Sequence, residues 1–292
     1  MKIGIVGVGP WGRVMAACFE RAGLEVAAYD RGDLTKKVFD MGEHMKLEDM
    51  ASSSEISIVA SAAPPETTMK VFEACQLHRK PCFLTKPFLI EENPRDLTAP
   101  VFVDYVHLAS PLYERLRKSA TRDYTTEKTT INMSGKGPSR SYPGVLDYGA
   151  HALAVAHDLH GLGPLEDLEA RALSRSEVGG GPELALASAK IGKTKLTILT
   201  GNAADKPTRL IEVTLKNGPV VSYEEKMRVA TLNIDRKQSL RAPGQDPLSL
   251  LVERFLWDID AGRINPYFVE LSAAATRSCR QIREKAGLLP RF

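Results

Sequence analysis

Short apolar runs and helical periodicities alternate through the first third of the chain. Strand-length runs cover residues 2–6, 25–29, 56–60, 82–85 and 101–105. Apolar residues recur at helical spacing after Pro10 and after Pro65, and shorter helices are predicted over residues 34–41 and 111–119. Strands that alternate with helices predict a parallel, doubly wound sheet, which we assign to a first domain of residues 1–120.

Beyond residue 120 the pattern changes to one long helix followed by strands of alternating polarity. The helix is predicted over residues 144–161, and the strands over residues 168–173, 184–191, 195–200, 209–215, 220–224 and 229–234. Turn signals such as Gly192-Lys193 separate the strands, which favours a mostly antiparallel sheet. Two helices, over residues 247–259 and 269–285, close a second domain of residues 121–292, so the fold class is α/β.

Composition and charge narrow the class of partner. Of 292 residues, 43% are apolar, and the net charge is +3 with no basic run longer than Lys36-Lys37 or Arg79-Lys80. We therefore expect no nucleic acid and no membrane as partner. The chain has no apolar segment of transmembrane length and no recognisable leader at its N-terminus, so we expect a cytoplasmic location.

Cysteine and histidine spacing gives no support for a metal site. The four cysteines show no C-x-x-C spacing and lie in apolar patterns, so buried, reduced thiols are expected at Cys18, Cys75, Cys82 and Cys279. His157 and His160, with Asp158, imitate a metal-binding pattern. Two histidines three residues apart on a helix are more often structural, and we expect no bound metal.

The most specific motif is the turn after the first strand. Gly7, Gly9 and Gly12 fill the three glycine positions of G-x-G-x-x-G, the dinucleotide-binding pattern of Rossmann domains. Gly7 permits the tight turn, Gly9 lets a pyrophosphate approach the backbone, and Gly12 lets the helix pack close to the strand. Pro10 suits the first turn of that helix and is followed by Trp11.

An acidic residue follows the second strand. Asp30 lies about twenty residues after the glycines, where an acidic side chain accepts hydrogen bonds from the adenosine ribose. It repels a 2′-phosphate and so favours NAD, whereas Arg31 beside it would hold such a phosphate, so NADP stays open. Structural turns also need glycine, but the order of strand, glycines, helix, strand and acid favours nucleotide binding.

Two further sets of residues are candidates for a catalytic role. Lys86 follows the strand over residues 82–85, at the sheet edge where such folds bind ligands, and its ammonium could stabilise charge on a substrate oxygen. The plain alternative is a solvated lysine before Pro87. Asp147 and His151, four residues apart on a predicted helix, share a face, so the carboxylate could orient an imidazole that exchanges a proton. An exposed ion pair is the plain alternative there.

Together these motifs resemble the glucose-fructose oxidoreductase / inositol dehydrogenase / MocA family, nearly end to end. The resemblance is carried by Gly7–Gly12, Ala63–Pro65, Lys86-Pro87, Asp147–His151 and Phe255–Gly262. It implies a Rossmann domain followed by an α/β domain whose open, largely antiparallel sheet mediates oligomer contacts. It also implies a catalytic lysine at Lys86 and a D-x-x-x-H motif at Asp147 and His151.

The chain departs from the family pattern at several places. Thr85 replaces the glutamate of E-K-P, Leu108 stands where many relatives carry arginine, and Ala154 where many carry aspartate. The segment between Pro87 and Val101 is also short. These departures spare the three proposed catalytic groups and leave the identity of the substrate open.

We expect an NAD(P)-dependent oxidoreductase that interconverts a secondary alcohol and its ketone on a sugar-like or nucleotide-sugar substrate. His151 is expected to take the hydroxyl proton while Lys86 stabilises charge on the same oxygen and Asp147 orients the imidazole. A non-catalytic NAD(P)-binding sensor on the same scaffold is the alternative function. Reduction of an imine or a tetrapyrrole is a third possibility.

The remaining predicted contacts are to cofactor, substrate and a second copy of the chain. The predicted nucleotide contacts are Gly7, Gly9, Pro10, Trp11, Gly12, Asp30, Arg31, Ala62, Pro64 and Lys86. The predicted substrate contacts are Lys86, Tyr105, His107, Tyr142, Asp147 and His151. The cofactor is expected to be NAD, with NADP possible, and the protein is expected to form a dimer or tetramer.

Overall fold

The computed structural model describes residues 1–29, 47–90, 96–121, 125–137, 142–175, 182–216, 218–226, 229–235, 238–242 and 246–288. Internal contacts divide the chain into two compact units. Unit 1 comprises Met1–Val106 and Asp246–Glu270, and unit 2 comprises His107–Gln245 and Leu271–Phe292. This division differs from the predicted boundary at residue 120, because a helix over residues 111–121 belongs to unit 2 and a helix over residues 247–260 belongs to unit 1.

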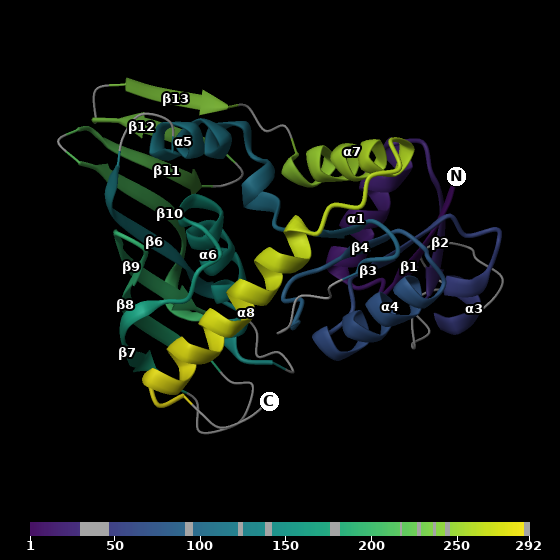
Figure 1. Cartoon of the computed structure of the whole chain (residues 1–292), viewed down its shortest axis with the longest axis horizontal. Helices are drawn as coiled ribbons and strands as arrows, with labels where there is room; N and C mark the ends of the chain where they lie inside the picture. Colours follow the sequence, from purple (N-terminus) through teal and green to yellow (C-terminus); the bar gives the residue numbers. More distant parts are fainter. Residues whose placement is uncertain are drawn as a thin grey trace. The chain divides into compact units, whose positions relative to one another are not determined.

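Unit 1 is built on a parallel sheet, as predicted. Its strands are β1 (Lys2–Val6), β2 (Glu25–Tyr29), β3 (Ile58–Ser61), β4 (Cys82–Leu84) and β5 (Val101–Val103) (Figure 1). They are paired in parallel in the order β2-β1-β3-β4-β5. The direction of strand progression reverses between β1 and β3, and ligands bind at the carboxyl ends of the strands beside such a switch point.

Among the described residues, four α-helices lie wholly within unit 1 beside this sheet. They are α1 (Pro10–Arg21), α3 (Leu47–Ser52), α4 (Pro65–Leu77) and α7 (Pro247–Asp260). The short α3 was not predicted, and the helix predicted over residues 34–41 lies outside the described residues. All four cysteines are buried, as predicted, and none of them is joined in a disulfide.

Aromatic packing explains why α7 belongs to unit 1. Phe255 of α7 packs on Phe83 of β4, with ring centroids 5.5 Å apart, and on Phe102 of β5 at 5.2 Å. Phe19 of α1 meets Phe83 edge to face, and Phe268 lies against Phe102. Such pairs contribute about 0.5–1.5 kcal/mol each beyond the area they bury. The amphipathic pattern of α7 alone could not say against which sheet it would pack.

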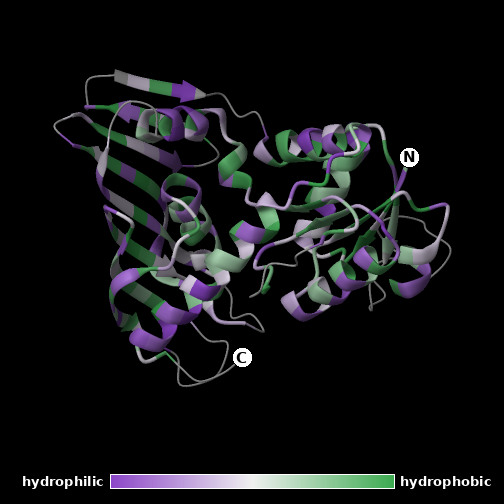
Figure 2. Ribbon diagram, in the orientation of Figure 1, coloured by the Kyte–Doolittle hydropathy of each residue, from purple (hydrophilic) through white to green (hydrophobic). Residues whose placement is uncertain are grey.

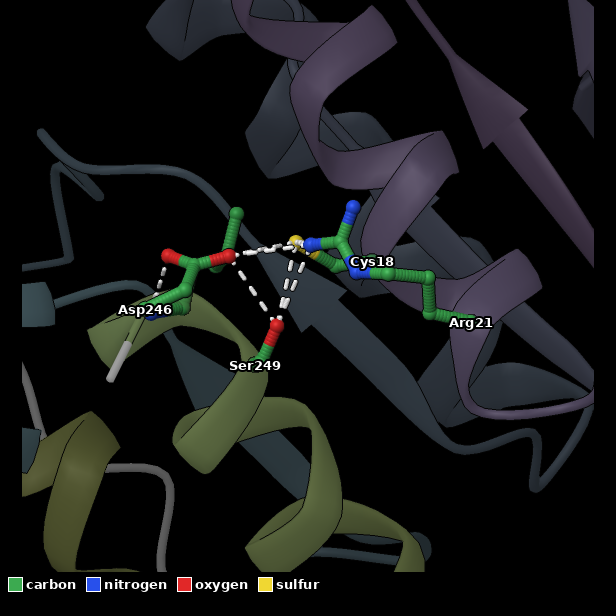
Figure 3. A network of polar contacts seen from close by, with 5 residues as sticks. Cys18, Arg21, Asp246 and Ser249 are labelled. Carbon is green, nitrogen blue, oxygen red and sulfur yellow. Dashed lines mark hydrogen bonds and ion pairs between the residues drawn. The ribbon is translucent and has the colours of Figure 1, made fainter. Parts of the chain in front are cut away.

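Polar contacts also join α7 to α1 (Figure 3). Asp246 caps α7, since its Oδ1 accepts a hydrogen bond from the backbone N–H of Leu248 at 3.2 Å. Its Oδ2 lies 3.0 Å from the guanidinium of Arg21 and accepts hydrogen bonds from Ser249 at 3.0 Å and Cys18 at 3.3 Å. Burial raises the pKa of the Cys18 thiol above its ordinary value, so the thiol stays protonated and donates.

Replacing Asp246 by alanine should lower the free energy of unfolding of unit 1 by about 0.5–2 kcal/mol, the usual contribution of an N-cap. The exposed ion pair with Arg21 should add little. Asp246→Asn keeps a capping oxygen and should lose less. Both tryptophans, Trp11 and Trp257, belong to unit 1, so urea denaturation followed by tryptophan fluorescence measures the effect. An alanine variant as stable as the wild type would contradict the capping role.

Unit 2 is built on a second sheet with the strand order β13-β12-β11-β10-β6-β9-β8-β7. Neighbouring strands are antiparallel except β6 and β9, which are parallel, so the mostly antiparallel prediction is confirmed. The strands are β6 (Thr126–Lys136), β7 (Glu166–Ser174), β8 (Leu184–Ile191), β9 (Thr194–Gly201), β10 (Ala203–Leu215), β11 (Val220–Lys226), β12 (Val229–Ile234) and β13 (Gln238–Ala242). Figure 2 shows polar and apolar residues alternating along them.

Helix α6 (Gly144–His160) is packed between this sheet and α8 (Tyr267–Lys285). A Cβ placed at Gly149 of α6 would lie 3.0 Å from Cys279 Sγ of α8 and 3.6 Å from Thr200 Cγ2 of β9. Helix α6 is apolar over most of its surface because it is covered on both sides. Unit 2 also contains α5 (Pro111–Thr121). Within the described segments, no helix has the length and apolar composition that a membrane span requires.

Candidate active site

The glycine turn (Gly7–Gly12) connects β1 to α1 beside the switch point of the unit 1 sheet. Gly7 has a φ of +88°, and a Cβ there would lie 3.0 Å from backbone atoms of Ala62 and Ala63. A Cβ at Gly12 would lie 1.9 Å from the carbonyl oxygen of Gly7. The fold itself therefore requires glycine at both positions, as predicted.

Gly9 differs, because the fold does not require glycine there. It precedes α1 with a φ of −60° and a ψ of −175°, which any residue adopts, and a Cβ would meet no atom of the described residues within 4 Å. No side chain from the described part of the chain caps the N-terminus of α1. Open space beside the backbone and uncapped N–H groups at a helix N-terminus are what a pyrophosphate needs. The residues of the glycine turn thus fit a dinucleotide.

Replacing Gly9 by alanine should leave the unfolding midpoint unchanged and weaken NADH binding about 10-fold or more, equivalent to about 1.4 kcal/mol. The added methyl group would occupy the space through which the pyrophosphate approaches. Gly163→Ala is the matched control, because a Cβ at Gly163 likewise meets no atom of the described segments within 4 Å. Fluorescence titration with NADH measures the change, and equal affinity of the Gly9→Ala variant and the wild type would refute a pyrophosphate site at this turn.

The turn after β3 lies directly against the glycine turn. The backbone N–H of Ala62 donates to the carbonyl of Val6 at 2.8 Å. The hydroxyl of Thr68 donates to the carbonyl of Ala63 at 3.1 Å, and α4 begins at Pro65 with Pro64 as an N-cap without a side-chain hydrogen bond. The structure therefore brings Ala62 and Gly7 together at the switch point. The predicted ribose contacts Asp30 and Arg31 lie outside the described residues.

A buried carboxylate that the sequence analysis missed lies at the end of β5. Asp104 Oδ1 accepts a hydrogen bond from the backbone N–H of Lys86 at 2.7 Å. Its Oδ2 accepts hydrogen bonds from the Thr85 hydroxyl at 3.0 Å and from the indole N–H of Trp11 at 2.5 Å. Trp11 and Lys86, both predicted to contact the nucleotide, are thus linked through one side chain. The peptide bond between Lys86 and Pro87 is cis.

Burial raises the pKa of Asp104 to about 6, although hydrogen bonds from Lys86, Trp11 and Thr85 and the Lys86 ammonium all favour the carboxylate. The folded protein therefore binds a proton at Asp104 more tightly than the unfolded chain does. Its contribution to stability declines as the pH rises from its ordinary pKa, near 4, to about 6. A carboxylate that disfavours folding at neutral pH is typical of functional sites.

In unit 2, His107 lies between Glu225 and His151. The Nδ1 atom of His107 is 3.2 Å from Glu225 Oε2, and the ring of His107 meets that of His151 nearly edge to face, with centroids 4.8 Å apart. The hydrogen bond from His107 lowers the pKa of Glu225, so Glu225 is ionised. Tyr223 also hydrogen-bonds Glu225, and burial raises the pKa of its hydroxyl to about 12. The structure thus brings two predicted residues, His107 and His151, together.

The other predicted residues are placed as follows. Asp147 and His151 both lie on α6, with Asp147 only 5% exposed and His151 half-buried. Tyr142 precedes α6 and is half-buried, whereas Tyr105 follows β5 in unit 1 and is 1% exposed. The catalytic and substrate-binding roles given to these residues stay predictions.

His157 and His160 have structural partners. His157 Nδ1 donates to the carbonyl of Gly161 at 3.0 Å, and its Nε2 lies 2.9 Å from the Ser278 hydroxyl. His160 Nε2 lies 2.9 Å from the Thr129 hydroxyl, and burial lowers its pKa to about 4, so it is neutral. These contacts agree with the structural interpretation of both histidines.

Solved structures with a similar fold are found for this chain. No protein-family model matches the sequence, and no curated protein matches it. A UDP-N-acetylglucosamine 3-dehydrogenase from Acidithiobacillus ferrooxidans superposes with a TM-score of 0.82 at 16% identity, over 99% of this chain and 98% of the other. A 3-ketoreductase from Actinomadura kijaniata, in complex with TDP-benzene and NADP, gives a TM-score of 0.75 at 14% identity over 97% and 96%.

A third structural relative acts on a different class of compound. It is a biliverdin reductase from Synechocystis sp. PCC 6803 in complex with biliverdin and NADP+, with a TM-score of 0.76 at 14% identity over 98% of this chain and 99% of the other. These likenesses confirm the predicted fold, a Rossmann-type parallel sheet followed by a mostly antiparallel sheet. At such identities they establish the fold and leave the substrate open.

Proposed function

We propose that this chain is an NAD(P)-dependent oxidoreductase of the glucose-fructose oxidoreductase / inositol dehydrogenase / MocA family. Its substrate would be a secondary alcohol, or the corresponding ketone, on a sugar-like or nucleotide-sugar compound. The observation that carries the proposal is the open space beside Gly9, in a glycine turn at the switch point of a parallel sheet. Structural relatives that include a nucleotide-sugar dehydrogenase and an NADP-bound 3-ketoreductase support it.

The residues that would hold the nucleotide belong to unit 1. The backbone at Gly9 and the first turn of α1 would bind the pyrophosphate, and the turn at Ala62 and Pro64 would border the nicotinamide ribose. When bound, the nicotinamide supplies the hydride acceptor or donor.

His151, Lys86 and Asp147 would carry the proton chemistry. In the oxidation direction His151 accepts the hydroxyl proton on a ring nitrogen as the carbon loses hydride, which gives a ketone and an imidazolium that returns its proton to water. The Lys86 ammonium stabilises the negative charge that grows on the same oxygen. Asp147 would hold the imidazole of His151 in its working tautomer.

His107 and Glu225 would support this imidazole. Glu225 fixes the orientation of His107 through Nδ1, and the ring of His107 packs against that of His151. The rotation of the His151 ring is thereby limited, which favours one proton-accepting position.

The proposal is tested by oxidation of NADH and NADPH with a panel of carbonyl compounds. The panel holds UDP- and TDP-linked keto-sugars, the same keto-sugars without the nucleotide, and biliverdin as the compound of a different class. We expect NADH consumption with at least one keto-sugar. Binding of NADH without reduction of any compound would favour the non-catalytic sensor. Reduction of biliverdin alone would indicate a tetrapyrrole reductase. Failure to bind either nucleotide would contradict the proposal.

A further inference from the structure

Asp104 has no part in the chemistry proposed above, yet it joins three segments of unit 1 at the carboxyl ends of the strands. Its hydrogen bonds reach Trp11 in the first turn of α1, and Thr85 and Lys86 after β4. Asp104 itself directly follows β5. The carboxylate therefore connects the glycine turn to the segment at Thr85 and Lys86.

We propose that Asp104 is a positioning residue that fixes Trp11 of the glycine turn relative to Lys86, so that nucleotide binding and placement of the Lys86 ammonium depend on one carboxylate. This inference rests on the proposed function. It adds a residue that neither the glycine motif nor the lysine motif includes.

The three hydrogen bonds to Asp104 explain why position 104 needs a carboxylate. The indole N–H of Trp11 and the backbone N–H of Lys86 can only donate, and the Thr85 hydroxyl also donates here. An ionised carboxylate accepts all three at its two oxygens. A protonated acid or an asparagine amide presents a donor in place of one acceptor, which leaves a buried donor without its partner.

The pattern of exposure separates positioning from simple packing. Asp104 is 1% exposed, whereas Trp11 is 39% exposed and Lys86 is half-buried. Trp11 and Lys86 therefore reach the surface where a ligand can contact them, while Thr85 and the carboxylate of Asp104 are buried. Among the described residues, the charge that acts on Asp104 is the Lys86 ammonium, which favours the carboxylate form.

Trp11 offers a spectroscopic readout that needs neither nucleotide nor substrate. The chain has two tryptophans, so Trp257→Phe leaves Trp11 as the sole tryptophan. In that background the emission of Trp11 should titrate with a midpoint near pH 6, because the pKa of Asp104 is raised to about 6. The titration should disappear in Trp257→Phe/Asp104→Asn and persist in the control Trp257→Phe/Asp49→Asn, since Asp49 is exposed on α3.

Kinetics and nucleotide affinity test the positioning role itself. Asp104→Asn should lower kcat roughly 10- to 100-fold, because small displacements of reacting groups cost about that much, and should also weaken NADH binding. Thr85→Val removes one of the three donors and should have a smaller effect, which Thr85→Ser should avoid. A merely structural role would lower the free energy of unfolding and leave kcat and NADH affinity of the folded enzyme unchanged.

Two results would overturn the inference. The first is a Trp11 emission that does not respond to pH, or that responds identically in the Asp104→Asn variant. The second is an Asp104→Asn enzyme with wild-type kcat and NADH affinity. A wild-type protein that binds no nucleotide would instead overturn the proposed function, and the Trp11 titration would then decide alone whether Asp104 holds the indole.

Discussion

Replacing His151 by alanine is expected to lower kcat by about 10²- to 10⁴-fold, the usual contribution of a general acid or base. The dissociation constant for NADH should stay unchanged, because His151 is not among the residues predicted to hold the nucleotide. Added imidazole should restore part of the lost rate, since it can accept the proton that the missing side chain would have taken. Steady-state kinetics of alcohol oxidation and NADH titration measure these effects.

A second histidine substitution provides the control for this experiment. His78 is exposed just after α4, so His78→Ala should retain the wild-type kcat and should not respond to imidazole. A His151→Ala enzyme that turns over as fast as His78→Ala would show that the proton is taken by another group.

Replacing Lys86 by alanine is expected to lower kcat by about 10²- to 10³-fold, which is the cost of removing one group that stabilises developing negative charge. The backbone N–H of residue 86 still donates to Asp104 in this variant, so the substitution removes the ammonium and leaves that hydrogen bond in place. The pKa of Asp104 should rise above its value of about 6, because the ammonium favours the carboxylate. Kinetics measure the first effect, and the Trp11 titration measures the second.

The control for the Lys86→Ala variant is a substitution of another lysine in unit 1 that has no proposed role. Lys70 is exposed on α4, and Lys70→Ala should match the wild type in both measurements. Lys86→Arg retains a positive charge but presents a planar fork, so we expect an intermediate rate. A Lys86→Ala enzyme with wild-type kcat would remove the lysine from the mechanism.

The parts of the fold that follow local rules were predictable from sequence. Buried parallel strands are continuous apolar runs, and the turn between β1 and α1 needs glycine for steric reasons at Gly7 and Gly12. Strand β6, at the centre of the second sheet, was missed because its sequence is rich in threonine and lysine and resembles a loop. It is recognised as a strand through its long-range pairing with β10 and β9. The placement of α7 likewise depends on tertiary aromatic contacts.

Part of the candidate site was predictable from sequence because several of its residues lie in short local motifs. Gly9, Lys86, Asp147 and His151 lie in local motifs, but the partners that orient such groups come from elsewhere in the chain. Asp104 could have been recognised from the sequence as an acidic residue directly after the buried strand β5. The sequence indicates Glu225 less clearly: by the two-residue period of β11, Glu225 shares a strand face with the buried Val221 and Tyr223.

Hydride transfer from NADH to a keto-sugar can be followed with deuterium. NADH deuterated at C4 of the nicotinamide is incubated with the protein and with keto-sugars that do and do not carry a nucleotide, and the products are examined by mass spectrometry. We expect deuterium on the new carbinol carbon of at least one sugar product, formed by the wild type and by Lys70→Ala and nearly absent with His151→Ala. Bound NADH that transfers deuterium to none of these compounds would contradict the proposed function.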